Sequence, residues 1–321
     1  MPPSSISRHD AATPERRALL VLLVYLACIL VAMLATGAAA RRPWLVAGHV
    51  LAIVYVAAIA RRVDARSTSQ GALWLPVVAL PVLYAELGVL FEASQRLPLD
   101  PLVLVWEQRL FGDPARTLAS RAPWSVVSEL LHAGYLSYYP LIVLPPLALA
   151  LRGREWRRAH GQTVLALTLA FTSCFLLFAV LPVEGPRYRF GAAPGAPPGV
   201  FRDLARALLQ QGSSRGTAFP SSHVAVSVAL TLAVLEHQRP VGLAAAFCTL
   251  LIAVGAVYGG FHYAVDVVAG LAVGVVVAVA ARRLSRAPAP PDGGVQPREP
   301  DGGEFSLPPT PGARDTSRTP R

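Results

Sequence analysis

Long apolar blocks limit what this chain can fold into more than any other feature. A helix needs about 20 apolar residues to cross a bilayer. Eight blocks approach or reach this length, at residues 18–39, 44–60, 72–92, 129–151, 162–182, 221–236, 240–258 and 262–282. The first block is longer than the apolar core of a signal peptide, and a second block follows closely. We therefore predict an all-α integral membrane protein with eight spanning helices, of which the sixth is the shortest.

The distribution of arginine predicts the orientation of these helices. The net charge of +10 comes from arginine alone, because the sequence contains no lysine. The basic clusters share one side of the membrane in this arrangement, at residues 16–17, 61–66, 152–158, 239 and 282–286. The positive-inside rule makes that side the cytoplasm and places both termini there. Arg41 and Arg42 are the exception.

The same pattern bears on partners and on location. Short basic clusters between apolar blocks are typical of membrane loops and not of a nucleic-acid-binding face, so no nucleic-acid partner is expected. The use of arginine without lysine favours a bacterial plasma membrane. Membrane lipids are the expected surroundings, and the oligomeric state is not indicated.

The segment 93–128 is predicted to lie on the outer face and to contain a helix of its own. Its apolar residues recur at helical spacing, at Leu99, Leu102, Val103, Trp106 and Leu110. Asp100 is positioned to cap this helix, and a proline follows it. Glu107 and Arg109 fall off the apolar face. We predict an amphipathic helix in the outer membrane interface.

Two polar residues open the last apolar block. His262 and Asp266 are four positions apart, so they share one face of a helix. A carboxylate that accepts a hydrogen bond from one imidazole nitrogen fixes the tautomer and leaves the other nitrogen as a nucleophile. From these two residues alone, a pair that only satisfies its own hydrogen bonds is an equally open interpretation.

Two further polar clusters are predicted on the same outer face. Ser221, Ser222 and His223 open the sixth block. A helix N-terminus binds anions, so the serines could hold phosphate oxygens while His223 protonates a leaving alkoxide. Taken alone, the serines are better explained as helix caps. Arg187 and Arg189 could balance the negative charge of phosphoryl transfer, or bind lipid head groups.

Together these clusters resemble the motifs of the PAP2 superfamily, which are carried on a six-helix membrane bundle. Residues 220–223 read Pro-Ser-Ser-His where the family has Pro-Ser-Gly-His, and His262 and Asp266 match the end of Ser-Arg-x5-His-x3-Asp. Gly255 and Ala256 stand at the Ser-Arg positions, and the lysine of the first motif, Lys-x6-Arg-Pro, is absent. Residues 185–187 read Gly-Pro-Arg, which is similar to a shorter form of that first motif.

Two upstream stretches are similar to the Aur1/Ipt1-type inositolphosphotransferase branch of this superfamily. They run from Asp100 to Gly112 and from His132 to Tyr139. The likeness covers about residues 72–282, which we expect to form a PAP2-like catalytic membrane domain of six helices. A cytoplasmic segment at 1–17 and two additional transmembrane helices at 18–71 precede it. A disordered cytoplasmic tail at 283–321, rich in Pro, Gly, Asp and Arg, follows it.

The resemblance implies a role for each matching residue. His262 would be the nucleophile, Asp266 would orient it, and His223 would be the acid. No metal ion and no cofactor are expected. The residues expected to hold the phosphate are Arg187, Ser221, Ser222 and Arg189.

The expected function is cleavage or transfer of a lipid-linked phosphate through a phosphohistidine, at the outer face. Transfer of a polar phosphate head group is one form of this reaction. Plain hydrolysis of phosphatidate or a polyprenyl phosphate or diphosphate is the alternative, and a non-catalytic relic or lipid transporter is a second. Glu86, His132, Tyr135 and Tyr138 are polar residues in or near the third and fourth blocks, which makes them functional candidates. Glu86 and His132, near outer helix ends, could line the pocket or select the acceptor, or could simply lie at the interface. His49 is interpreted as structural.

Overall fold

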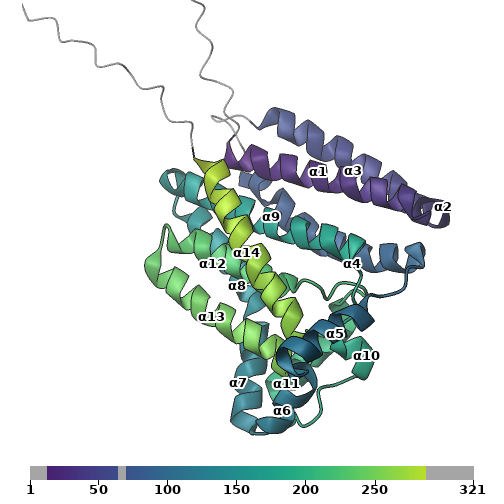
Figure 1. Ribbon diagram of the computed structural model, residues 1–321. Coiled ribbons are helices and arrows are strands. Elements are labelled where there is room, and N and C mark those ends of the chain that lie inside the picture. The colour runs from purple at the N-terminus through teal and green to yellow at the C-terminus, as the bar shows by residue number, and fades with distance from the viewer. Residues whose placement is uncertain (1–12, 64–69, 287–321) are drawn as a thin grey trace, which may run out of the picture. The chain divides into compact units, whose positions relative to one another are not determined.

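The computed structural model describes residues 13–63 and 70–286, which form helices joined by short connections (Figure 1). The longer elements are α1 (Pro14–Ala35), α3 (Pro43–Arg62), α4 (Gln70–Ser94), α9 (Arg157–Val180), α13 (Arg239–Tyr258) and α14 (Ala264–Ser285). The others are α2 (Ala38–Arg41), α5 (Asp100–Phe111), α6 (Pro114–Arg121), α7 (Ser125–Leu136), α8 (Tyr138–Leu151), the 3-10 turn η1 (Arg154–Trp156), α10 (Pro186–Phe190), α11 (Val200–Gly212) and α12 (Ser222–Leu235).

The predicted all-α membrane fold is confirmed. The described residues contain no strand beyond one isolated bridge between Val183 and Thr217. Six helices are individually long and apolar enough to cross a membrane: α1, α3, α4, α9, α13 and α14. The pair α7 and α8 forms a seventh candidate span that is bent by 43°. Of the predicted tail at 283–321, residues 283–285 belong to α14, and 287–321 lie outside the described residues.

The remaining predicted span, α12, is too short to count among the candidate spans, and it is buried at the centre of the bundle. It has 14 residues, which gives a length of about 21 Å, less than the roughly 30 Å of a bilayer core. Most of its side chains are buried, and α9, α13 and α14 pack around it. A helix that is apolar on all sides fits such a central position, where it needs no lipid-facing surface.

Glycines allow the central helices to approach one another closely. On α14, a Cβ at Gly270 or Gly274 would lie 2.5 Å from the carbonyl oxygen of Ser221 or 2.6 Å from that of Ala225. On α13, a Cβ at Gly255 would lie 2.3 Å from the carbonyl oxygen of Leu131 on α7. The contact between α13 and α7 therefore excludes a larger residue at 255, where the superfamily motif has serine.

The arginine-rich ends of the helices gather at one end of the bundle. The Arg157 guanidinium lies 3.2 Å from Glu15, and that of Arg282 lies 3.1 Å from Glu236. These pairs join the beginnings of α1 and α9 and the ends of α12 and α14. We call the opposite end of the bundle the site end, because the three polar clusters predicted from sequence lie there.

Arg41, the exception to the predicted charge pattern, lies at the site end for a structural reason. It donates hydrogen bonds to the carbonyls of Thr36 and Ala93, at the ends of α1 and α4. The last carbonyls of a helix have no partner within the helix, so an arginine that binds them stabilises both helix ends.

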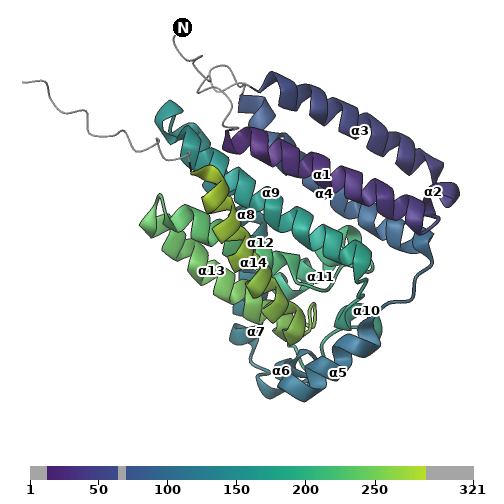
Figure 2. The same cartoon turned by 45° about the horizontal axis from the view of Figure 1, so that its top comes forward.

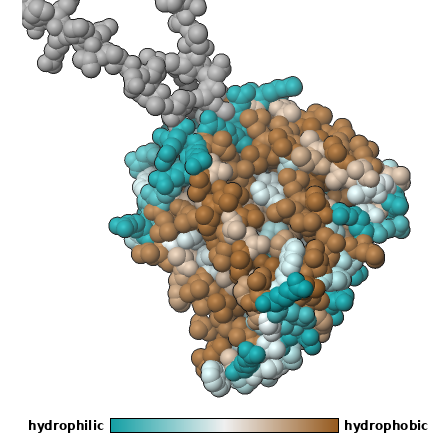
Figure 3. Space-filling model, viewed as in Figure 1, coloured by the Kyte–Doolittle hydropathy of each residue, from teal (hydrophilic) through white to brown (hydrophobic). Residues whose placement is uncertain are grey.

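On the face shown in Figure 3, the surface between the two ends is largely apolar. Large side chains point outward from the spanning helices, such as Leu51, Val82 and Leu243, each at least 65% exposed. Exposed apolar patches of this extent require a nonaqueous neighbour. These faces therefore suit contact with lipid.

Helix α5 is amphipathic as predicted, but its apolar face points outward. Its buried residues are Asp100, Val103 and Glu107, whereas Leu102, Trp106 and Leu110 are exposed. The prediction that Asp100 caps this helix is wrong. Leu99 holds the cap position, and the Asp100 carboxylate bonds to another segment.

Candidate active site

A cleft opens at the site end between α4, α7, α10, α11 and the beginnings of α12 and α14. It encloses about 380 Å³ of empty space, including its open mouth. Three of the residues predicted from sequence line it: His223, His262 and Arg187. The other lining residues are Tyr84, Tyr135, Glu184, Tyr188, Leu209, Ser213, Ser214, Thr217, Ala218 and Phe261.

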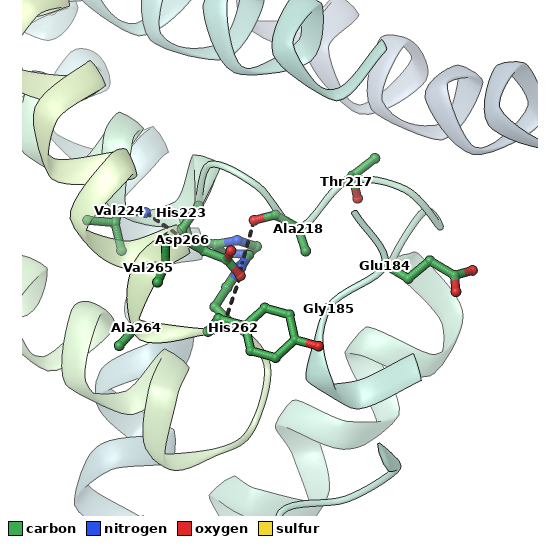
Figure 4. A network of polar contacts seen from close by, with 12 residues as sticks. Glu184, Gly185, Thr217, Ala218, His223, Val224, His262, Ala264, Val265 and Asp266 are labelled. Carbon is green, nitrogen blue, oxygen red and sulfur yellow. Dashed lines mark hydrogen bonds and ion pairs between the residues drawn. The ribbon is translucent and has the colours of Figure 1, made fainter. Parts of the chain in front are cut away.

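His262 is held through one ring nitrogen. Its Nδ1 lies 3.1 Å from the carbonyl oxygen of Ala218 and 3.4 Å from Oδ2 of Asp266 (Figure 4). Both partners are acceptors, so they favour a proton on Nδ1 and leave the lone pair on Nε2. The predicted His–Asp contact is present. The carbonyl of Ala218, which makes the shorter contact, had no sequence signal.

The backbone before α14 places His262 at the cleft. The amides of Phe261 and His262 both donate to the carbonyl of Ala256, which closes a tight turn after α13. Gly260 lies in that turn with φ +66°, a conformation that favours glycine. The Asp266 carboxylate also accepts from the Tyr263 amide at 2.8 Å, so it fixes the start of α14 as well as the imidazole.

His223 faces His262 across the same cleft. It is the second residue of α12, and its ring centre lies 5.7 Å from that of His262, nearly edge-on. Its Nε2 lies 3.2 Å from the hydroxyl of Tyr135. Its ring also packs against Tyr135 and Tyr138, at 5.0 Å and 4.3 Å between centres. Tyr135 was among the polar residues of the spans considered as functional candidates from the sequence, and it lines the cleft. Its contact with His223 had no sequence signal.

The phosphate-binding residues predicted from sequence are only partly brought together. Arg187 is the one arginine that lines the cleft in the described part of the chain, and it donates to the Ser213 hydroxyl. Arg189 is exposed and does not line it. Ser221 caps α12, with its hydroxyl 3.5 Å from the amide of Val224.

Ser222 is buried in the first turn of α12, and neither serine lines the cleft. The predicted phosphate contacts of both serines and of Arg189 stay predictions. Arg187 is the one cationic side chain among the described residues that line the cleft, and several hydroxyl groups line it as well.

Two buried carboxylates of α5 hold the segments that carry the site. Asp100 accepts from the amides of Glu184 and Gly185, at 2.8 and 2.9 Å, and from the hydroxyl of Tyr263 at 3.3 Å. Glu107 accepts from the amides of Ala264 and Val265, each at 3.0 Å. Helix α5 thus joins the segment before Arg187 to the beginning of α14.

The sequence placed Glu107 off the apolar face of this helix and gave no indication that its side chain is fully buried. The signal that could have identified it is its spacing. Asp100 and Glu107 are seven residues apart, or about two helical turns, so they share one face. Burial raises the pKa of Glu107, while the two amides of α14 lower it, and the net direction is upward.

Glu86 and His132 do not line the cleft. Glu86 pairs with His49 at 2.9 Å, which links α4 to α3. His132 lies within hydrogen-bonding distance of the Ser128 carbonyl, at 2.7 Å from Nδ1, and packs edge-on against Phe261. His132 is therefore linked to the cleft through its contact with Phe261, and Glu86 belongs to the packing of the N-terminal helices.

The fold and the cleft define a multi-pass membrane protein with a two-histidine site. Comparison with protein families matches residues 102–280, more than half of the chain, to the PAP2 superfamily. The chain belongs to the PAP2 superfamily, and this membership supports a phosphatase-type function. No curated protein matched, and no solved structure matched. The predicted resemblance to the superfamily is confirmed, whereas the Aur1/Ipt1-type branch stays a prediction.

Proposed function

We propose that this protein cleaves phosphate esters of membrane lipids through a phosphohistidine on His262. The observation that carries this proposal is the pair of imidazoles facing one another in one cleft. His262 is engaged through Nδ1, which leaves Nε2 for attack, and Arg187 lies in the same cleft. A nucleophile, a second imidazole for proton transfer and a cation are the parts that phosphoryl transfer needs.

In the first step, Nε2 of His262 attacks phosphorus and the bond from phosphorus to the lipid oxygen breaks. Protonated His223 gives its proton to that oxygen, so the lipid leaves as an alcohol. Asp266 and the Ala218 carbonyl stabilise the positive charge that develops on His262. Arg187 offsets the charge on the phosphoryl oxygens.

In the second step, an acceptor resolves the phosphohistidine. His223, now neutral, takes a proton from water, and the water oxygen attacks phosphorus as the bond from nitrogen to phosphorus breaks. Inorganic phosphate leaves and His262 regains its lone pair. The hydroxyl of Tyr135, 3.2 Å from Nε2 of His223, supports that imidazole in both protonation states, because a hydroxyl can donate or accept.

Head-group transfer is the second candidate. It follows the same first step, with an alcohol in place of water in the second. The hydroxyls of Tyr84 and Ser213 line the cleft without donating to a protein carbonyl, and such groups suit a polyhydroxylated acceptor. We further propose that the arginine-rich end faces the cytoplasm and the site end faces outward.

The test measures inorganic phosphate released by detergent-purified protein from a panel of lipid phosphates, with EDTA present. We expect release by the wild type and by His237→Ala, a histidine control in the loop between α12 and α13. His262→Ala and His223→Ala should fall to background. Full activity of His262→Ala would refute the mechanism.

The acceptor is tested in the same assay. Release without added alcohol identifies a phosphatase. Exchange that occurs only when an alcohol or a second lipid is added identifies a transferase. Silence in both arms would favour the non-catalytic relic.

A further inference from the structure

A second cleft lies beside the candidate active site, where α1, α4 and α9 end. The empty space in the cleft and its open mouth comes to about 350 Å³. Its lining is mostly small or apolar: Ala32 and Thr36 from α1, Leu87, Leu90, Phe91 and Ser94 from α4, Phe178 and Ala179 from α9, and Arg96, Pro182, Gly216 and Thr217 from the connections. We call it the chain cleft.

The two clefts share a wall. Thr217 lines both of them. On its two sides, Gly216 lines the chain cleft and Ala218 lines the active-site cleft. On α4, Tyr84 lines the active-site cleft and Leu87, about one helical turn further, lines the chain cleft. A molecule bound by His262 therefore has the chain cleft as its neighbour.

The polar groups of the chain cleft are already engaged with protein carbonyls. The hydroxyls of Thr36 and Ser94 donate within their own helices, to Ala32 and Phe91. The Thr217 hydroxyl donates to the carbonyl of Ser214.

The guanidinium of Arg96 donates to the carbonyls of Ala179 and Val180, at the end of α9. What the chain cleft offers a ligand is thus methyl, methylene and aromatic surface, which suits a hydrocarbon and not an ion or a polar head group.

Helix α1 supplies one side of the chain cleft through small residues. Ala32 and Thr36 are four positions apart and share a helix face. Figures 1 and 2 both show α1 running beside α4 and α9. Helices α1 and α4 precede residue 102, where the match to the PAP2 superfamily begins. The chain cleft is therefore partly formed by the N-terminal helices.

We propose that the chain cleft holds the first part of the hydrocarbon chain of a lipid phosphate whose phosphate lies at His262. The proposal rests on the proposed function. A hydrocarbon chain that moves from the bilayer into this cleft stays in an apolar environment, so the hydrophobic effect adds little to its binding. Its binding comes from close packing against the cleft and from its alignment with the phosphate at His262. The N-terminal helices thereby contribute to selection among chains of different length.

The experiment fills the cleft with Ala32→Trp and compares two substrates: dioleoyl phosphatidate in detergent micelles and water-soluble dihexanoyl phosphatidate. We expect kcat/KM for the long-chain substrate to fall about tenfold, the effect of overpacking a filled site. The short-chain value should change less than about twofold, because the histidines are untouched. The matched control is Ala35→Trp, an exposed residue of the same helix, which should behave as wild type. Equal losses for both substrates, or no loss for either, would overturn the proposal.

A second measurement separates this proposal from the proposed function. The His262→Ala variant is irradiated with a phosphatidate that carries a diazirine in its chain, and the labelled peptides are identified. We expect labels on α1 and α4 at the cleft residues, suppressed by excess phosphatidate but not by diacylglycerol. Labels spread evenly over lipid-facing residues refute the chain cleft even if hydrolysis is found. Labels at the cleft with no hydrolysis uphold it while the proposed function fails.

Discussion

Glu107 offers the sharpest test of how α5 acts on the site. Its two carboxylate oxygens each accept one amide of α14, from Ala264 and Val265, close in sequence to His262. A hydrogen bond to a charged group contributes about 1.5–3 kcal/mol. Glu107→Gln keeps one carbonyl oxygen and turns an NH₂ group toward the other amide. We expect stability to fall by about that amount, one such bond.

The effect on catalysis should exceed what this loss of stability implies. A displacement of about 1 Å at a reacting group costs roughly 100-fold in rate, and a partial shift of α14 costs less. We therefore expect kcat to fall by about 10-fold or more, with KM little changed. The assay is phosphate release at saturating lipid phosphate, measured well below the melting temperature.

A matched control exists on α7. Glu129 accepts from the amides of Phe201 and Arg202, at 3.2 and 3.3 Å, and so binds the beginning of α11 in the same way. That end of α11 carries no proposed catalytic group, so Glu129→Gln should cost stability but little kcat. If Glu107→Gln loses no more kcat than Glu129→Gln, the idea that α5 positions His262 is wrong.

Three further predictions concern other contacts. Tyr135→Phe removes the hydroxyl next to His223, so kcat should fall about tenfold while the melting temperature stays within a few degrees; unchanged kcat would remove Tyr135 from proton transfer. Because the pKa of Glu107 is raised in the fold, its contribution to stability is complete below the pKa of an unfolded glutamate and is lost as pH rises through the folded value. Melting curves of the wild type over mildly acidic pH should show this loss, and a Glu107→Gln curve with the same slope would contradict it. Glu86→Gln replaces the charged partner of His49 between α3 and α4 by a neutral amide, and should destabilise the protein by about 1.5–3 kcal/mol; a double variant, Glu86→Leu with His49→Leu, should melt higher than the single one.

The spans were predictable because their signal is local. A bilayer requires long apolar helices, and each of the eight predicted blocks coincides with a helix or a helix pair in the described residues, although α12 is too short to be a candidate span. The bend in the fourth block was not predicted. Helix α7 ends at Leu136, and Pro140 lies four residues later. If the helix continued without a break, the ring of Pro140 would clash with the carbonyl oxygen of Leu136. The proline is visible in the sequence, but membrane helices often tolerate proline, so the break could not be inferred.

The site was predictable where its residues lie close together in the sequence. The contact between His262 and Asp266 was predictable from their spacing, because residues four apart lie on the same face of a helix. The partners that come from distant segments had no such signal. The Ala218 carbonyl, the Tyr135 hydroxyl and the carboxylate of Asp100 reach the site only through the packing of several helices.

The shortness of α12 has a consequence for where the chemistry takes place. If its far end lies level with one membrane surface, its beginning stops about 9 Å short of the other, since the helix is about 21 Å long and the apolar core is about 30 Å. His223 sits at that beginning, so a phosphate must descend below the level of neighbouring head groups to reach it. Lipids then differ as substrates by the cost of removing their phosphate from water, and that cost rises with each charge the phosphate carries. Removing a phosphodiester, which has one negative charge, from water therefore costs less free energy than removing a fully ionised phosphomonoester.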